Sequence, residues 1–132
     1  MSSSLRAVLI VDDSADTLEM YAIALSQAGY RPLTATDAES ALLTLRSDPP
    51  NAVVTDLQFP RGIGGWGLIQ ELKNDAATRE IPVIVLTGRT EPSIVADAQH
   101  AGCAAVVTKP CLPDDLARVI RQILPGGGTA AA

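Results

Sequence analysis

The sequence predicts an α/β domain built on a doubly wound, five-stranded parallel sheet with five helices. Short apolar runs rich in β-branched residues alternate with segments in which apolar residues recur at helical spacing. Because parallel strands need right-handed crossovers, this alternation places helices on both faces of an open sheet. The chain has 132 residues, of which 47% are apolar and 19% charged, and this composition suits a single globular domain.

The expected strands recur at intervals along the whole chain. A weak strand is expected over Arg31 to Thr34, and the other four are continuous apolar runs of the kind buried on both faces of a sheet. These four runs are Ala7 to Val11, Ala52 to Thr55, Val83 to Leu86 and Ala104 to Val107. The order of elements is therefore a strand followed by a helix, repeated five times.

The segments between the strands carry helix signals. Gly29 and Gly102 are placed to end the first and fourth helices, and Pro113 can open the fifth. The run Thr36-Asp-Ala-Glu39 has the pattern of a capping box for the second helix. We expect one domain over residues 5–124, with 1–4 and 125–132 as flexible tails.

Composition argues against several functional classes. The net charge is −5 and no Lys/Arg cluster occurs, so nucleic acid is not an expected partner. No apolar run is long enough to cross a membrane, and the first residues lack the pattern of a secretory signal. The two cysteines, Cys103 and Cys111, match no zinc-ligand spacing. We therefore expect a cytoplasmic protein without nucleic-acid or membrane partners.

Polar residues follow four of the expected strands. Asp12 and Asp13 follow the first, Asp56 the third, Thr87 the fourth and Lys109 the fifth. The carboxyl ends of parallel strands meet at one edge of the sheet, so these side chains should converge. Asp12 and Asp13 also have a simpler interpretation, as caps of the first helix.

Three neighbouring carboxylates would repel one another, and a divalent cation removes that repulsion. Carboxylate oxygens with a carbonyl and water suit Mg²⁺ that keeps room for a phosphate oxygen. With Lys109 as a second cation, the charges balance. An ionised Asp56 can then attack phosphorus, while Thr87 and Lys109 bind the transferred oxygens.

Taken in order, these motifs resemble the receiver domain of bacterial two-component response regulators, from about Leu5 to Leu124. The matching segments are Leu9-Ile-Val-Asp-Asp13, Val53-Val-Thr-Asp56, Pro60, Leu86-Thr87-Gly88 and Thr108-Lys109-Pro110. The resemblance implies a flavodoxin-like fold with strand order 2-1-3-4-5 and a cis Lys109-Pro110 bond.

The resemblance also implies a phosphorelay role. Asp56 would accept a phosphoryl group from a phosphohistidine on a sensor histidine kinase or a histidine phosphotransfer protein, and the domain would then contact a downstream protein target. Asp13, Asp56 and the Gln58 carbonyl would ligate Mg²⁺ directly, and Asp12 mostly through water. Self-phosphorylation from phosphodonors and slow autodephosphorylation are the only catalysis expected.

The chain departs from the family pattern at several positions, and one departure leaves another function open. Val106 stands where the family usually has an aromatic residue, which favours a receiver-like interaction module, or a receiver fragment of a hybrid kinase, that works without phosphorylation. Residues 61–65 form a glycine-rich segment one residue longer than usual, which predicts a mobile loop. A haloacid-dehalogenase-type phosphohydrolase is a further alternative, but it needs an acid where Gln58 stands.

Overall fold

The computed structural model describes residues 5–57, 62–89 and 91–124. A five-stranded parallel sheet has the order β2-β1-β3-β4-β5. The strands are β1 (Ala7–Val11), β2 (Arg31–Ala35), β3 (Ala52–Thr55), β4 (Val83–Thr87) and β5 (Ala105–Thr108). The helices are α1 (Ala15–Gln27), α2 (Ala38–Ser47), α3 (Gly64–Asn74), α4 (Pro92–His100) and α5 (Pro113–Ile123). The predicted fold class and strand order are confirmed. The boundaries of the domain, residues 5–124, stay a prediction.

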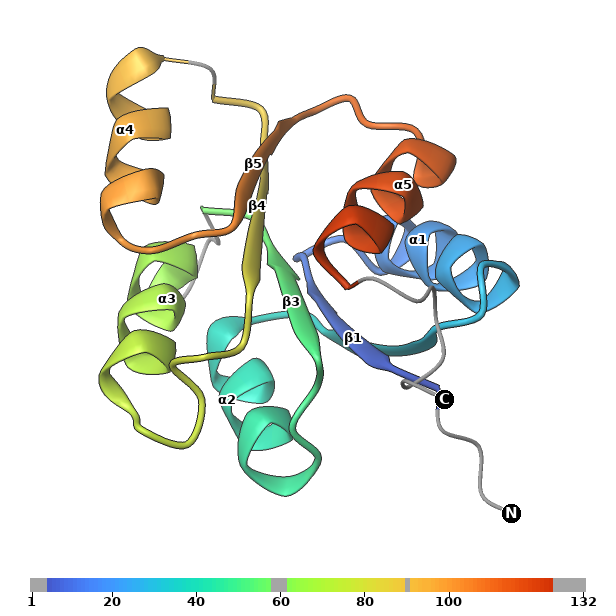
Figure 1. The fold of residues 1–132 in the computed structure, drawn as a ribbon, viewed down its shortest axis with the longest axis horizontal. Coiled ribbons are helices and arrows are strands. Elements are labelled where there is room, and N and C mark those ends of the chain that lie inside the picture. The colour runs from blue at the N-terminus through green and yellow to red at the C-terminus, as the bar shows by residue number, and fades with distance from the viewer. Residues whose placement is uncertain (1–4, 58–61, 90, 125–132) are drawn as a thin grey trace.

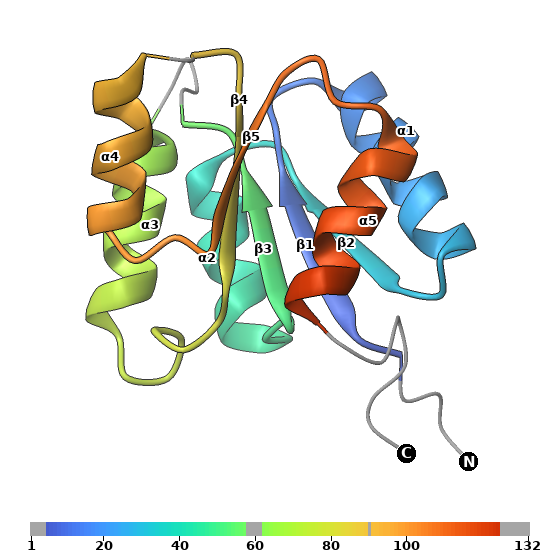
Figure 2. The ribbon, with the colours of Figure 1, turned by 45° about the horizontal axis from the view of Figure 1, so that its top comes forward.

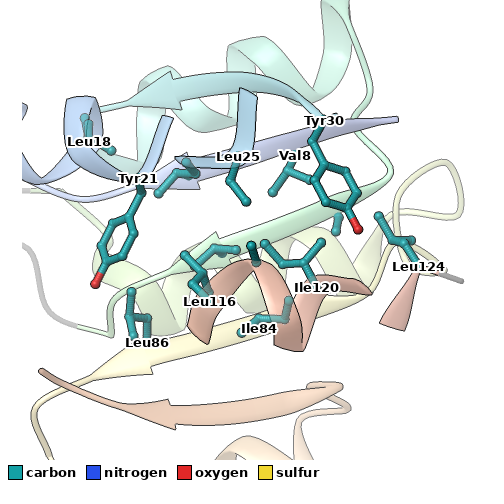
Figure 3. Close-up of a cluster of buried hydrophobic side chains, with 14 residues drawn as sticks. Val8, Leu18, Tyr21, Leu25, Tyr30, Ile84, Leu86, Leu116, Ile120 and Leu124 are labelled. Carbon is teal, nitrogen blue, oxygen red and sulfur yellow. The ribbon is translucent and has the colours of Figure 1, made fainter. Parts of the chain in front are cut away.

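The sheet separates two apolar layers. Helices α1 and α5 cover one face, and α2, α3 and α4 cover the other (Figure 1). Side chains of β1, β3 and β4 alternate between the faces, so that Val8 and Ile10 pack with α1 and α5 while Leu9 and Val11 pack with α2 and α3. Figure 3 shows the first of these clusters, in which Leu116 and Ile120 of α5 meet Leu25 of α1. Burial on both faces explains why these strands have continuous apolar sequences.

The edge strand β5 differs from the expectation. Its residues were expected to be buried on both faces, but Ala105, Val106 and Val107 are only half-buried and Thr108 is exposed. The reason is position, because among the described residues β5 pairs with β4 alone and lies at the edge of the sheet. The strand also begins one residue later than predicted and extends to Thr108, whose partner in the register is Thr87.

The helix ends follow most of the sequence signals. Gly29 and Gly102 adopt positive φ angles of 96° and 89° after α1 and α4, and Pro113 is the first residue of α5. The capping-box prediction for α2 is wrong by one residue, because the cap is Asp37 rather than Thr36. The Asp37 side chain accepts a hydrogen bond from the Ser40 backbone N–H at 2.7 Å.

Candidate functional site

The residues at the carboxyl ends of the strands lie together at one edge of the sheet (Figure 2). Backbone hydrogen bonds extend the strand pairing into this edge, from Asp12 N to the Ala35 carbonyl (3.1 Å) and from Lys109 N to the Thr87 carbonyl (2.8 Å). The Lys109-Pro110 peptide bond is cis, as the resemblance implied. The two backbone hydrogen bonds fix the positions of Asp12 and Lys109 relative to the sheet.

The ammonium group of Lys109 contacts two carboxylates. Its Nζ donates to Asp56 Oδ2 at 2.9 Å and to Asp12 Oδ2 at 3.0 Å, and we call this arrangement the lysine bridge. The Asp12 side chain is only 5% exposed and that of Asp56 18%, so both carboxylates need a compensating cation. Burial lowers the pKa of Lys109, but hydrogen bonds and charge from Asp56 and Asp12 outweigh it and raise the pKa overall. Lys109 is therefore charged at neutral pH.

Each of the two carboxylates is also held by local backbone. Asp12 Oδ1 accepts from Ser14 N at 2.9 Å, and Asp56 Oδ1 accepts from Leu57 N at 2.6 Å. One oxygen of each group is thus oriented by its own chain segment, and the other faces Lys109. The helix-cap interpretation of Asp12 and Asp13 is wrong, because Ser14 is the cap of α1 and its hydroxyl accepts from Thr17 N.

The other predicted site residues have different surroundings. Thr87 is buried at the end of β4, and its Oγ1 accepts from Arg89 N at 3.1 Å. Asp13 is exposed to solvent beside Asp12, because consecutive residues point in different directions. Gln58 lies outside the described residues. Within the described ranges, no three Asp, Glu, His or Cys side chains form a group that could hold a metal ion.

The donor chemistry nevertheless fits a hard divalent cation. Asp12 and Asp56 direct oxygens at a single positive charge, the Lys109 ammonium, so this point of the fold stabilises a cation. Carboxylate oxygens are the ligands that Mg²⁺ prefers, and the exposed Asp13 adjoins them in sequence.

The start of α3 packs directly on the backbone of Asp56. A side chain at Gly65 would place its Cβ 1.9 Å from the Asp56 carbonyl oxygen and 2.6 Å from the Leu57 Cα. Gly65 N also donates to the Leu57 carbonyl at 3.1 Å. The predicted mobile loop is therefore wrong for Gly64 and Gly65, which form the first turn of α3. Sequence reasoning missed this contact, although adjacent glycines so close to a strand-end acid were a usable signal.

Comparison with known proteins agrees with this geometry. Residues 8–121 match the response regulator receiver domain family. The phosphate regulon transcriptional regulatory protein PhoB of Escherichia coli (strain K12) is 34% identical over 119 residues, which are 90% of this chain and 52% of PhoB. The chain thus spans about half the length of the curated relatives it matches.

Solved structures give the same result. The N-terminal domain of a response regulator receiver protein from Methanoculleus marisnigri JR1 is 32% identical, with a TM-score of 0.74 over 92% of this chain and 98% of that one. The structure of the chemotaxis protein CheY4 of Vibrio cholerae is 24% identical in sequence and has a TM-score of 0.84. The match covers 90% of this chain and 98% of CheY4, and it supports the fold.

The chain belongs to the response regulator receiver domain family of two-component systems. Members of this family serve as phospho-acceptor receivers and are not enzymes in the usual sense, so the phosphohydrolase alternative is not supported. In the described part of the chain, every helix is too short or too polar to cross a membrane.

The tight contact at Gly65 leads to a stability prediction. Gly65→Ala should lower the free energy of unfolding by about 2 kcal/mol or more, since the new methyl group would overlap backbone atoms of Asp56 and Leu57, which cannot rotate away as a side chain can. Helix propensity alone would favour alanine by about 0.5–1 kcal/mol, so the sign of the change separates the two effects. Denaturant unfolding measures it. Gly88→Ala is the matched control, because a Cβ there meets nothing within 4 Å. Equal stability of the two variants would contradict the contact.

Proposed function

We propose that Asp56 accepts a phosphoryl group from a phosphohistidine on a sensor histidine kinase or a histidine phosphotransfer protein. The lysine bridge carries this proposal, because it joins Asp56 to Asp12 and a cation at the carboxyl edge of the sheet. The phosphorylated domain then signals through contacts with a downstream protein target. With a net charge of −5, it makes no nucleic-acid or membrane contact of its own.

The chemistry is a displacement at phosphorus. A carboxylate oxygen of Asp56 forms a bond to phosphorus as the bond from phosphorus to the imidazole nitrogen breaks. That nitrogen keeps the electron pair, and because the other ring nitrogen of the phosphohistidine carries a proton, the ring leaves as neutral imidazole. Lys109 moves its contact from the Asp56 carboxylate to a phosphoryl oxygen. The Thr87 hydroxyl, which accepts from Arg89 N, still has its own proton to donate to another phosphoryl oxygen. The same residues accept a phosphoryl group from small phosphodonors and allow slow hydrolysis of the aspartyl phosphate.

Magnesium completes the charge balance of the site. Asp13, Asp56 and the Gln58 carbonyl would hold Mg²⁺ directly, with Asp12 acting mostly through water. Bound there, Mg²⁺ neutralises the negative charge shared by the carboxylates and the incoming phosphoryl group. Asp13 is exposed, so its carboxylate is available to a cation from solvent.

An apolar hollow beside Lys109 is the surface we assign to the phosphodonor protein. It has a volume of about 510 Å³ and lies between α1 and the segment that leads from β5 to α5. Met20 and Leu112, which are 43% and 69% exposed, line it together with Tyr21 and Lys109. A partner seated in this hollow lies next to Lys109, the lysine that contacts Asp56.

Val106 supports a second candidate, a receiver-like module whose interactions do not depend on phosphorylation. The residue is half-buried against the layer of α2, α3 and α4, and it lacks the bulk of the aromatic residue usual at this position. Direct phosphorylation distinguishes the two candidates.

The proposed function predicts one modified residue. Incubation with a small phosphodonor and Mg²⁺ should add one phosphoryl group to the wild-type chain, as measured by intact mass, and none to Asp56→Asn. Asp75→Asn is the matched control, because Asp75 is an exposed aspartate in the turn after α3, and it should be modified like wild type. Modification that persists in Asp56→Asn would place the acceptor elsewhere, and an unmodified wild type would support the phosphorylation-independent module.

The metal proposal predicts that Asp13→Ala weakens Mg²⁺ binding more than about tenfold, because loss of a direct ligand costs at least as much as loss of a supporting group. Titration followed by Trp66 fluorescence or by calorimetry measures the affinity. Asp16→Ala removes an exposed carboxylate three residues further along, in the first turn of α1, and should bind Mg²⁺ as wild type does. Equal affinities for all three proteins would remove Asp13 from the site.

A further inference from the structure

A buried tyrosine connects α1 to the segment that carries Lys109. The Tyr21 hydroxyl donates to the Cys111 carbonyl oxygen at 2.7 Å, across 90 positions of sequence. Tyr21 is only 3% exposed, and burial raises its pKa, so the hydroxyl keeps its proton and remains a donor at neutral pH. Cys111 is two residues beyond Lys109, in the connection between β5 and α5.

The second tyrosine of the chain shows that this bond is not a general need of the core. Tyr30 belongs to the same apolar cluster and is 1% exposed, but its hydroxyl lies near the Arg121 guanidinium of α5 and makes no hydrogen bond of ordinary geometry within the part of the chain that the structure describes. Figure 3 shows the two tyrosines at opposite ends of the cluster. The ring of each fills apolar space, but only the Tyr21 hydroxyl connects the core to a functional segment.

The position of the bond relates it to the lysine bridge. At one end of the connecting segment, Lys109 N is held by the Thr87 carbonyl; at the other, the Leu112 carbonyl accepts from Asp115 N and Leu116 N in the first turn of α5. Tyr21 secures the stretch between these two anchors. Since α1 begins just after Asp12, the bond fixes the segment that carries Lys109 relative to Asp12.

We propose that Tyr21 is a positioning residue, whose hydroxyl holds the segment 109–112 so that the Lys109 ammonium reaches both Asp12 and Asp56. The role rests on the proposed function, because its consequence for phosphoryl transfer acts through Lys109. A long lysine side chain loses considerable rotamer freedom when its ammonium is held at one point. If the backbone of the segment is already fixed, only the side chain has to be ordered, and the entropy cost is smaller. The hydroxyl touches neither the phosphoryl group nor the carboxylates, so its effect is indirect.

The test compares Tyr21→Phe with Tyr30→Phe, two identical changes in one apolar cluster. Tyr21→Phe should slow phosphorylation by a small phosphodonor at saturating Mg²⁺ about three- to tenfold, the range expected from losing one hydrogen bond. Tyr30→Phe should phosphorylate at the wild-type rate. In the unphosphorylated protein, the amide of Lys109, which donates to the Thr87 carbonyl, should exchange faster in Tyr21→Phe only.

A double-mutant comparison separates positioning from general destabilisation. In a Lys109→Ala background, Tyr21→Phe should have no further effect on the residual rate, because the group that it positions is gone. A wild-type rate in Tyr21→Phe, an equal loss in Tyr30→Phe, or a loss that persists without Lys109 would each overturn the proposal. If the wild-type chain accepts no phosphoryl group, the proposed function fails, and amide exchange at Lys109 alone decides whether Tyr21 holds the segment.

Discussion

The site depends on one ammonium group shared by two carboxylates. Asp12 and Asp56 come from different strands and are largely shielded from water, and like charges so placed repel one another. Lys109 contacts both at about hydrogen-bond distance, and the ammonium replaces the water that the carboxylates have lost. The same contacts raise the pKa of Lys109 and keep the lysine charged.

The parallel sheet makes this convergence possible. Residues 12, 56 and 109 are far apart in sequence, but each follows a strand, and β1, β3, β4 and β5 are neighbours that end at one edge. The layers on either side refine the arrangement: Gly65 lets α3 approach the Asp56 backbone, and Tyr21 connects α1 to the lysine segment. Under the proposed function, Lys109 exchanges a carboxylate for a phosphoryl oxygen with little rearrangement of the backbone.

The sequence predicted the features that depend on local pattern. β1 and β3 begin and end at the expected residues, because runs buried on both faces are apolar throughout, and the strand-end residues Asp12, Asp56 and Lys109 meet as expected. The half-burial of β5 was missed because burial depends on neighbours across the sheet. The α2 cap was displaced from Thr36 to Asp37 because both residues suit the position. The Gly65 contact and the bond from Tyr21 to Cys111 join segments that no local pattern relates.

The stability of the chain without metal tests the lysine bridge most directly. Lys109→Met keeps the length of the side chain and removes its charge, while Lys73→Met makes the same change at the only other lysine, whose ammonium donates to the Arg79 carbonyl on the surface. In a chelator, Lys109→Met should lower the free energy of unfolding by about 1–3 kcal/mol more than Lys73→Met, because two shielded carboxylates then face each other without a cation. Added Mg²⁺ should reduce this difference in the free energy of unfolding between Lys109→Met and Lys73→Met. Equal stability of the two variants in chelator would contradict the account.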